Sequence, residues 1–212
     1  MEYIYIVLER SHTLLGKLSR LTDPYEYTHI TVNLDGKMKC FYSFSRFLHY
    51  APFCSGFMKE TLDCYAYGKN KKVKLKVFKV PVTHEEKKRI RAFIRGIYED
   101  RKDYVFNLYS ALTMGIFGGF EIYKTYNCMS FTGKVLSMTD SVKMDRPYYR
   151  YNIEELDKLL TEYFYEEKEF ERKSIDSPGY MRPVDPLFNA GAFIRLNAVL
   201  LYRMAMKKCD QI

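Results

Sequence analysis

The pattern of apolar and polar positions predicts an α+β chain, with strands dominating its first part and helices its second. Short apolar or alternating runs bounded by turn residues predict strands, and two of them flank Asp35-Gly36, a pair typical of a tight hairpin turn. A loop is expected over residues 46–56, which contain Pro52 and Gly56. The expected strands are Tyr3–Leu8, Thr28–Leu34, Met38–Ser45, Lys59–Tyr67 and Val73–Val80.

Helices are predicted where a capping residue precedes apolar positions at helical spacing. The runs Thr83-His84-Glu85-Glu86 and Asn152-Ile153-Glu154-Glu155 have the capping-box pattern, and Asn127 or Thr125 can cap a helix that begins near Cys128. The last predicted helix is apolar around much of its circumference, so we expect it to pack against the body. The expected helices cover about residues 13–20, 84–98, 104–114, 127–138, 152–173 and 189–207.

These elements together predict an antiparallel sheet of about five strands, with the helix that carries Cys128 packed against it and further helices at the C-terminus. A chain of 212 residues is long enough for a substantial core. Arg146-Pro147 marks a boundary, so we divide the chain into a core over residues 1–145 and a helical extension over residues 146–212 that packs on it.

The net charge of +8 could favour an anionic partner. Much of the excess lies near Lys72–Lys76, however, where lysines alternate with apolar residues as in a strand with one solvated face. This pattern is typical of an edge strand that lysines protect from aggregation. We therefore do not expect a nucleic-acid partner.

The five cysteines, at positions 40, 54, 64, 128 and 209, include no Cys-x-x-Cys pair, and their number is odd. They therefore indicate neither a disulfide framework nor a zinc site, and the histidines show no metal-ligand spacing. We expect no metal ion, no cofactor and a cytoplasmic protein with reduced thiols. The N-terminus does not read as a signal peptide, and no apolar run approaches the roughly 20 residues that span a bilayer. Peripheral membrane contact stays open.

Cys128 and His29 are the residue types of a thiol–imidazole catalytic pair. Cys128 enters a predicted helix and His29 opens a predicted strand, 99 positions earlier. A thiol attacks as the thiolate, which a helix N-terminus and a nearby imidazolium both favour. The alternative is that Cys128 is a small buried apolar residue, as free cysteines commonly are.

Three stretches together resemble the circularly permuted papain-fold proteins of the NlpC-like superfamily, which includes amidase-like proteins and the lecithin:retinol acyltransferase group. These stretches cover parts of residues 1–140: Leu14–Arg20 with Tyr27–Val32, Phe41–Arg46 with Gly56–Glu60, and Tyr126–Leu136. In the permuted proteins the histidine strand precedes the cysteine helix, as it does here. The resemblance implies a permuted papain-like fold, a nucleophile at Cys128 and a general base at His29.

The family often adds a third polar residue on the strand after the histidine, to orient the imidazole ring. The matching strand here offers Ser43 and Ser45, which hold an imidazolium less well than a carboxylate does. Tyr27, Tyr42 and Tyr126 are candidates for lining the substrate site, although aromatic packing also explains them. The Cys128 backbone N–H, at a helix start, is the expected oxyanion donor.

The resemblance therefore predicts a cysteine hydrolase of the amidase or peptidase type that works through a thioester. Its substrate would be a small peptide, a cell-wall fragment or a lipid ester. Two alternatives remain: a thiol acyltransferase or esterase that acts on lipids, whose final helix would bind membranes, and a non-catalytic binding module that has kept the fold. The absence of a carboxylate, amide or second histidine on the strand after His29 favours the binding module.

Overall fold

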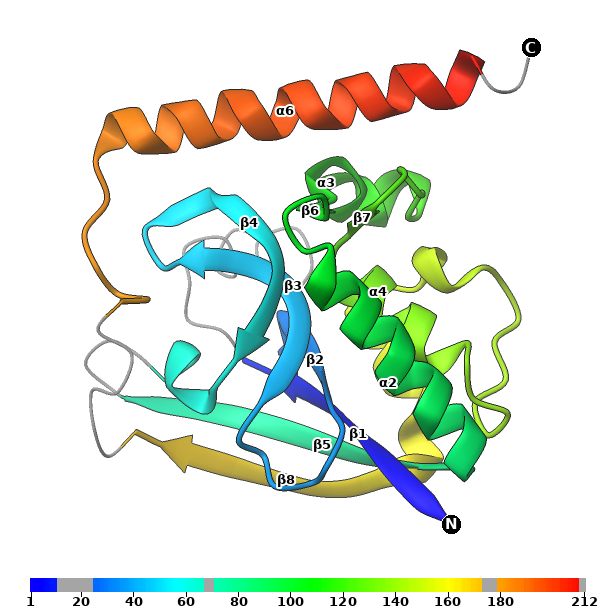
Figure 1. The fold of residues 1–212 in the computed structure, drawn as a ribbon. Coiled ribbons are helices and arrows are strands. Elements are labelled where there is room, and N and C mark those ends of the chain that lie inside the picture. Colours follow the sequence, from blue (N-terminus) through cyan, green and yellow to red (C-terminus); the bar gives the residue numbers. More distant parts are fainter. Residues whose placement is uncertain (11–24, 67–70, 173–178, 210–212) are drawn as a thin grey trace.

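The computed structural model describes residues 1–10, 25–66, 71–172 and 179–209, and its fold is α+β (Figure 1). One mixed sheet runs through these residues, formed by β1 (Glu2–Glu9), β2 (His29–Asn33), β3 (Phe41–Leu48), β4 (Ala51–Glu60), β5 (Lys72–Val82), β6 (Val105–Phe106), β7 (Thr125–Tyr126) and β8 (Phe164–Glu171). The helices are α2 (His84–Glu99), α3 (Leu108–Phe117), α4 (Cys128–Leu136), α5 (Ile153–Leu159) and α6 (Pro186–Cys209), with 3-10 turns η1 (Leu62–Cys64), η2 (Tyr148–Arg150) and η3 (Thr161–Tyr163).

The strands lie in the order β7-β6-β4-β3-β2-β1-β5-β8. Long antiparallel pairs join β1 to β5 and β3 to β4, whereas the short pair β6 and β7 is parallel. Strand β1 lies inside the sheet because it is apolar on both faces. Ile4, Ile6 and Leu8 enter a larger core, while Val7, with the opposite orientation, enters a second, smaller one.

The larger core lies between the sheet and the helices α2 and α4, which cover one of its faces in Figure 1. The smaller core contains Phe41 of β3, Val7 of β1 and Leu75 of β5, together with Tyr65. These residues come from strands that are not all neighbours in the sheet. The sheet therefore curls around the smaller core, and the β3–β4 hairpin rises above β5 in Figure 1.

The prediction of an antiparallel sheet of about five strands is wrong. The sheet is mixed and has eight strands in the described part of the chain. Residues 51–56, predicted as a loop, belong to β4. Pro52 is compatible with this strand because β4 pairs with β6 only at Gly56–Val105, so the missing N–H of Pro52 costs no bond on that side. The helix predicted over 104–114 begins at Leu108, because Val105 and Phe106 pair with β7.

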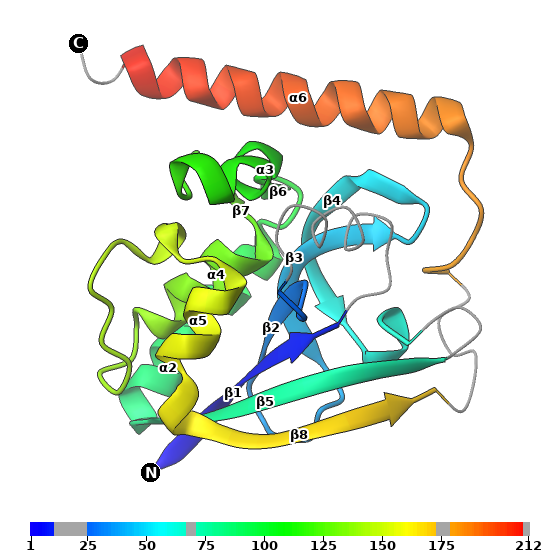
Figure 2. The ribbon, with the colours of Figure 1, turned by 180° about the vertical axis from the view of Figure 1, so that it is seen from behind.

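The helix predicted over residues 152–173 is also wrong beyond its first turns. The capping box at Asn152 is present, but α5 ends at Leu159, and Phe164–Glu171 forms strand β8. Strand β8 pairs with β5 along the lysine row, where Lys72 lies 2.7 Å from Glu169 and Lys74 lies 3.1 Å from Glu167 (Figure 2). The lysines thus face glutamates on a neighbouring strand, and β5 is not an edge strand.

Helix α6 begins at Pro186 and lies along β4 (Figure 1). The Phe193 ring stacks edge-on against Phe53 with 4.8 Å between centroids, and Leu196 and Leu200 are buried in a third small core. None of the helices in the described ranges is long and apolar enough to cross a lipid bilayer. The helix predicted near residues 13–20 and the turn predicted at residues 68–70 lie outside the described residues.

Two local features position helix α4: a capping box at its start and a close contact with η2 near its middle. At its start, Asn127 accepts a hydrogen bond from the backbone N–H of Ser130, and the Ser130 hydroxyl accepts one from the Asn127 N–H, which completes a capping box. Further along, Gly133 lets the backbone of η2 approach closely. A Cβ atom at position 133 would lie 2.5 Å from the carbonyl oxygen of Tyr148.

We predict that Gly133→Ala destabilises the protein by about 1–3 kcal/mol, because the added methyl group forces η2 away from α4. Gly96→Ala is the matched control, since Gly96 also lies in a helix but a Cβ there meets nothing within 4 Å. That change should stabilise the protein by up to about 1 kcal/mol. Urea unfolding of the two variants measures both values, and equal effects would contradict the close approach.

Candidate functional site

Cys128 is the first residue of α4, directly after the cap Asn127. The backbone N–H groups of the first turn therefore surround the thiol end of the helix, which carries the positive end of the helix dipole. Cys128 is 8% exposed and packs at the margin of the larger core. Helix α4 lies against β2 and β3, so the fold directs this end of the helix toward the strand that begins with His29.

His29 is the first residue of β2, and its side chain lies near enough to Cys128 for the thiol to help raise the pKa of His29. The structure thus brings together two residues that are 99 positions apart in the chain. The Nε2 atom of His29 lies 3.1 Å from Oε2 of Glu60 and 3.4 Å from the Ser43 hydroxyl. Because an imidazole has two nitrogens and Nε2 faces Glu60, Nδ1 remains for proton exchange with the thiol.

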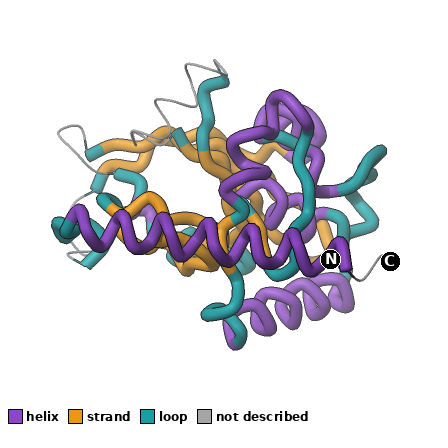
Figure 3. Tube along the Cα trace, turned by 90° about the horizontal axis from the view of Figure 1, so that it is seen from above, coloured by secondary structure: helices purple, strands orange, loops and turns teal. Residues whose placement is uncertain are grey.

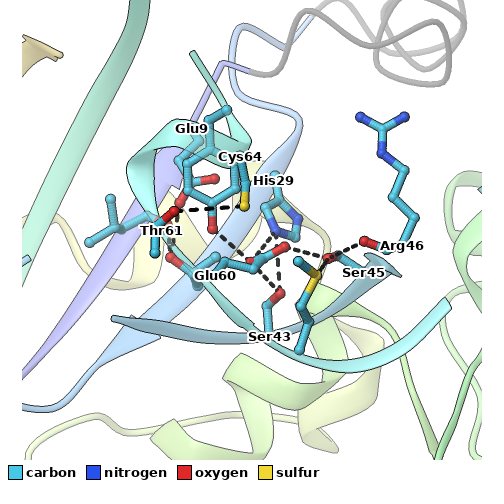
Figure 4. Close-up of polar contacts among 12 residues, drawn as sticks. Glu9, His29, Ser43, Ser45, Arg46, Glu60, Thr61 and Cys64 are labelled. Carbon is cyan, nitrogen blue, oxygen red and sulfur yellow. Dashed lines mark hydrogen bonds and ion pairs between the residues drawn. The ribbon is translucent and has the colours of Figure 1, made fainter. Parts of the chain in front are cut away.

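Glu60, the last residue of β4, is the site residue that the sequence analysis missed. Its carboxylate is 3% exposed and accepts hydrogen bonds from Ser43 at 2.6 Å, from Tyr65 at 2.6 Å and from Ser45 (Figure 4). Glu60 lies on β4, one strand beyond the strand that follows His29, where the third residue was expected. The signal that could have found Glu60 is a single acid at the end of Gly56–Glu60, one of the stretches that carried the resemblance.

Ser43 and Ser45, predicted as partners of the imidazole, mainly serve the carboxylate. Both lie on β3, between β2 and β4, and both hydroxyls donate to Glu60. Figure 4 shows the two serines and the His29 ring converging on the same carboxylate from neighbouring strands. The serines therefore help to fix the orientation of the group that holds the imidazole.

The site is built around an ion pair. Burial alone would lower the pKa of His29, but the charge of Glu60 and hydrogen bonds to Cys128 and Glu60 raise it well above its ordinary value. Burial would likewise raise the pKa of Glu60, but the charge of His29 and hydrogen bonds from His29, Ser43 and Ser45 lower it. Both shifts favour an imidazolium beside a carboxylate.

A second carboxyl group, that of Glu9, lies beside the ion pair. Glu9 is opposite His29 in the β1–β2 register and is fully buried. Its Oε1 accepts a hydrogen bond from the Thr31 hydroxyl at 3.0 Å, while its Oε2 has no partner among the described residues. Burial raises the pKa of Glu9 well above its ordinary value, so the structure favours a neutral carboxyl group here.

The three tyrosines predicted to line a substrate site have other partners. Tyr27 is 5% exposed and its hydroxyl donates to Glu167 of β8, and Tyr42 stacks on Phe57 with 6.2 Å between ring centroids. Tyr126 packs against Phe44 and Phe131, and burial raises the pKa of Tyr126 to about 12. The tyrosine nearest the ion pair is one that the sequence analysis did not select, Tyr65, whose ring centroid lies 5.8 Å from that of His29.

Cys64 is buried beside Thr61 and lies next to the site, close enough to Glu60 and Glu9 for their charges to act on its thiol (Figure 4). Cys40 and Cys54 are half-buried, and His84 pairs with Glu2 on the surface at 2.8 Å. Within the described ranges, no three or more histidine, cysteine or acidic side chains are grouped to hold a metal ion. Comparisons with protein-family models, with curated proteins and with solved structures found no match.

We predict that Glu60→Gln lowers the pKa of His29, because the variant loses the charge that outweighs burial. In the wild type the imidazole should keep its proton as the pH rises past about 6.5, the ordinary value, whereas in the variant it should lose it at lower pH. Imidazole chemical shifts followed by NMR between pH 4 and pH 10, about three units either side of neutrality, measure this. Glu85→Gln, an exposed change on α2, is the control. A His29 titration that is the same in all three proteins would contradict the ion pair.

We also predict that Glu9→Gln stabilises the protein at neutral pH. The pKa of Glu9 is raised in the folded state, so its favourable contribution exists at low pH and is lost as the pH rises above about 4.5. Glutamine mimics the neutral acid and removes this loss, which amounts to about 1.4 kcal/mol for each unit of effective pKa shift. Unfolding free energies of the two proteins should agree near pH 4 and diverge by pH 8, well above the ordinary pKa of the acid. A constant difference would contradict a buried neutral Glu9.

Proposed function

We propose that this protein is a cysteine hydrolase that cleaves an amide or ester through a thioester. The observation that carries the proposal is the chain of contacts from Cys128 to His29 to Glu60, formed at a helix N-terminus and across neighbouring strands. The three groups have the roles of nucleophile, base and orienting acid that thiol catalysis requires. We assign His29 and Cys128 as catalytic residues and Glu60 as a positioning residue.

In the proposed reaction, His29 holds the proton that Cys128 has given up, and the sulfur attacks the carbonyl carbon of the substrate as the thiolate. The backbone N–H of Cys128 is placed to donate to the oxygen that becomes negative. As the carbon–nitrogen or carbon–oxygen bond breaks, His29 returns the proton to the leaving amine or alcohol. Water then attacks the thioester with His29 as base, which releases the acid product and restores the thiol.

The strand after His29 offers only serines as partners for the imidazole, but Glu60 on β4 supplies the carboxylate. Its carboxylate fixes the orientation of the imidazole and stabilises the imidazolium that forms in each half of the reaction. Ser43, Ser45 and Tyr65 in turn restrain the carboxylate by donating to it. A carboxylate that is buried, charged and held by four neighbours favours catalysis over a binding module that has kept only the fold.

We further propose that the fold is of the circularly permuted papain type. Support comes from the order of the elements, with the His29 strand before the Cys128 helix, and from the packing of α4 against β2 and β3. Residues 14–20, part of the resemblance, lie outside the described residues. The proposed substrates are small peptides, cell-wall fragments or lipid esters. The exposed apolar residues of α6 are the one observation that favours a lipid-acting acyltransferase instead.

We predict that a small activated ester, p-nitrophenyl acetate, acylates Cys128. His29→Ala should slow the acylation by about 10²- to 10⁴-fold, the usual range for loss of a general base, and Glu60→Gln should slow it to a smaller extent. Intact-protein and peptide mass spectrometry identify the acylated residue and give the rate. Circular dichroism of each variant shows that the fold is intact.

Cys64→Ala is the matched control, because Cys64 is also a buried thiol near Glu60, but in the described part of the chain its side chain contacts the Thr61 hydroxyl rather than His29. Its loss should leave the acylation rate unchanged, whereas Cys128→Ala should abolish the reaction. If wild type and His29→Ala were acylated at the same rate, Cys128 would be a structural thiol. Co-sedimentation of acylated protein with liposomes, followed by transfer of the acetyl group to an alcohol rather than to water, would favour the acyltransferase.

A further inference from the structure

Helix α6 leaves one long apolar face without a neighbour among the described elements. Leu196 and Leu200 point into the body, while Leu187, Ile194 and Leu201 on the opposite side are 80%, 67% and 57% exposed. Seen from above, the helix crosses the whole width of the molecule as its outermost layer (Figure 3). Soluble proteins rarely expose an apolar face of this length without a partner.

The outward residues follow a heptad spacing, with intervals of four, three, four, three and four. Large and small side chains alternate strictly along this stripe, which we call the outer stripe: Leu187, Gly191, Ile194, Ala198, Leu201 and Ala205. All six are exposed. A spacing of this kind keeps one seam of a helix facing another helix along their common length.

The outer stripe is complementary to itself when two copies run antiparallel. With the twofold axis level with residue 196, Leu187 lies opposite Ala205 of the second copy, Gly191 opposite Leu201, and Ile194 opposite Ala198. Each layer then pairs one large and one small side chain, so the helices can approach closely at constant separation. A parallel pair would place large against large and small against small.

We propose that the protein forms a symmetric dimer through an antiparallel contact between the outer stripes of two α6 helices. A second copy is the partner that this pattern fits, because one surface supplies both halves of every layer. The contact is separate from Cys128 and His29 and does not depend on the proposed chemistry.

The exposed area is sufficient for such a dimer. A large apolar residue offers roughly 200 Å² when fully exposed. The three large stripe residues and Tyr202, which is 64% exposed beside them, therefore present about 500 Å² in each copy. Two copies would bury about 1,000 Å² from these side chains alone, which is the lower limit for a specific interface. The interface should accordingly be weak.

The test is sedimentation velocity of the full chain over a roughly hundredfold range of concentration that reaches about 200 µM, as a weak interface requires. We expect a reversible monomer–dimer equilibrium. Ala198→Glu should weaken the dimer at least about 10-fold, because it buries a charge against Ile194 of the second copy. Ala92→Glu makes the same change on the exposed side of α2 and should have no effect.

A compensating exchange tests the register. Ile194→Ala and Ala198→Ile should each weaken the dimer, and the double variant should recover most of the loss, because it exchanges large and small within the same layer. A protein that is monomeric at every concentration would overturn the proposal. So would equal effects of Ala198→Glu and Ala92→Glu, losses that add in the double variant, or a monomer that instead binds neutral or anionic lipid vesicles through α6.

Discussion

The buried ion pair between His29 and Glu60 is the interaction on which the candidate site depends. Removing two charges from water is costly, and the pair is tolerable only because hydrogen bonds surround it. Those bonds come from β3, which provides Ser43 and Ser45, and from Tyr65, which directly follows η1. The same network therefore fixes the register of three neighbouring strands and the orientation of the imidazole. The geometry of the candidate site and the local stability of the sheet therefore both depend on one carboxylate.

Glu9 adds a constraint to this network. A second ionised carboxylate beside Glu60 would compete for the positive charge of His29, and burial prevents this by favouring the neutral form of Glu9. The site thus contains two acids whose pKa values move in opposite directions. Burial raises the pKa of Glu9, whereas the charge of His29 and hydrogen bonds to the carboxylate lower that of Glu60. Environments that push the pKa values of neighbouring acids apart are a general feature of enzyme sites.

Local signals in the sequence predicted a large part of the fold. They also pointed to Cys128 and His29 of the candidate site, but not to Glu60. The capping boxes at Thr83 and Asn152 are intrinsic to short segments, so the starts of α2 and α5 could be read from the sequence. For α4 the sequence offered Asn127 or Thr125 as the cap, and the structure has Asn127. Glu60 could not be found in this way, because its role depends on β4 lying two strands from β2, a long-range pairing. Strand β8 was missed because its charged residues are compatible with a solvated helix as well as with a strand. The strand is favoured by ion pairs with the lysines of β5, which are distant in the sequence.

Strand β8 has a consequence for how the chain folds. The β5–β8 register joins Lys72 to Glu171, and the contact between His29 and Cys128 spans a similar separation. Contacts of such long range close large loops and slow folding. On the ribosome, β5 must wait beside β1 without its second neighbouring strand until residue 171 has emerged from the exit tunnel. The sheet is therefore completed late in synthesis, and the nascent chain carries an open, positively charged strand until then.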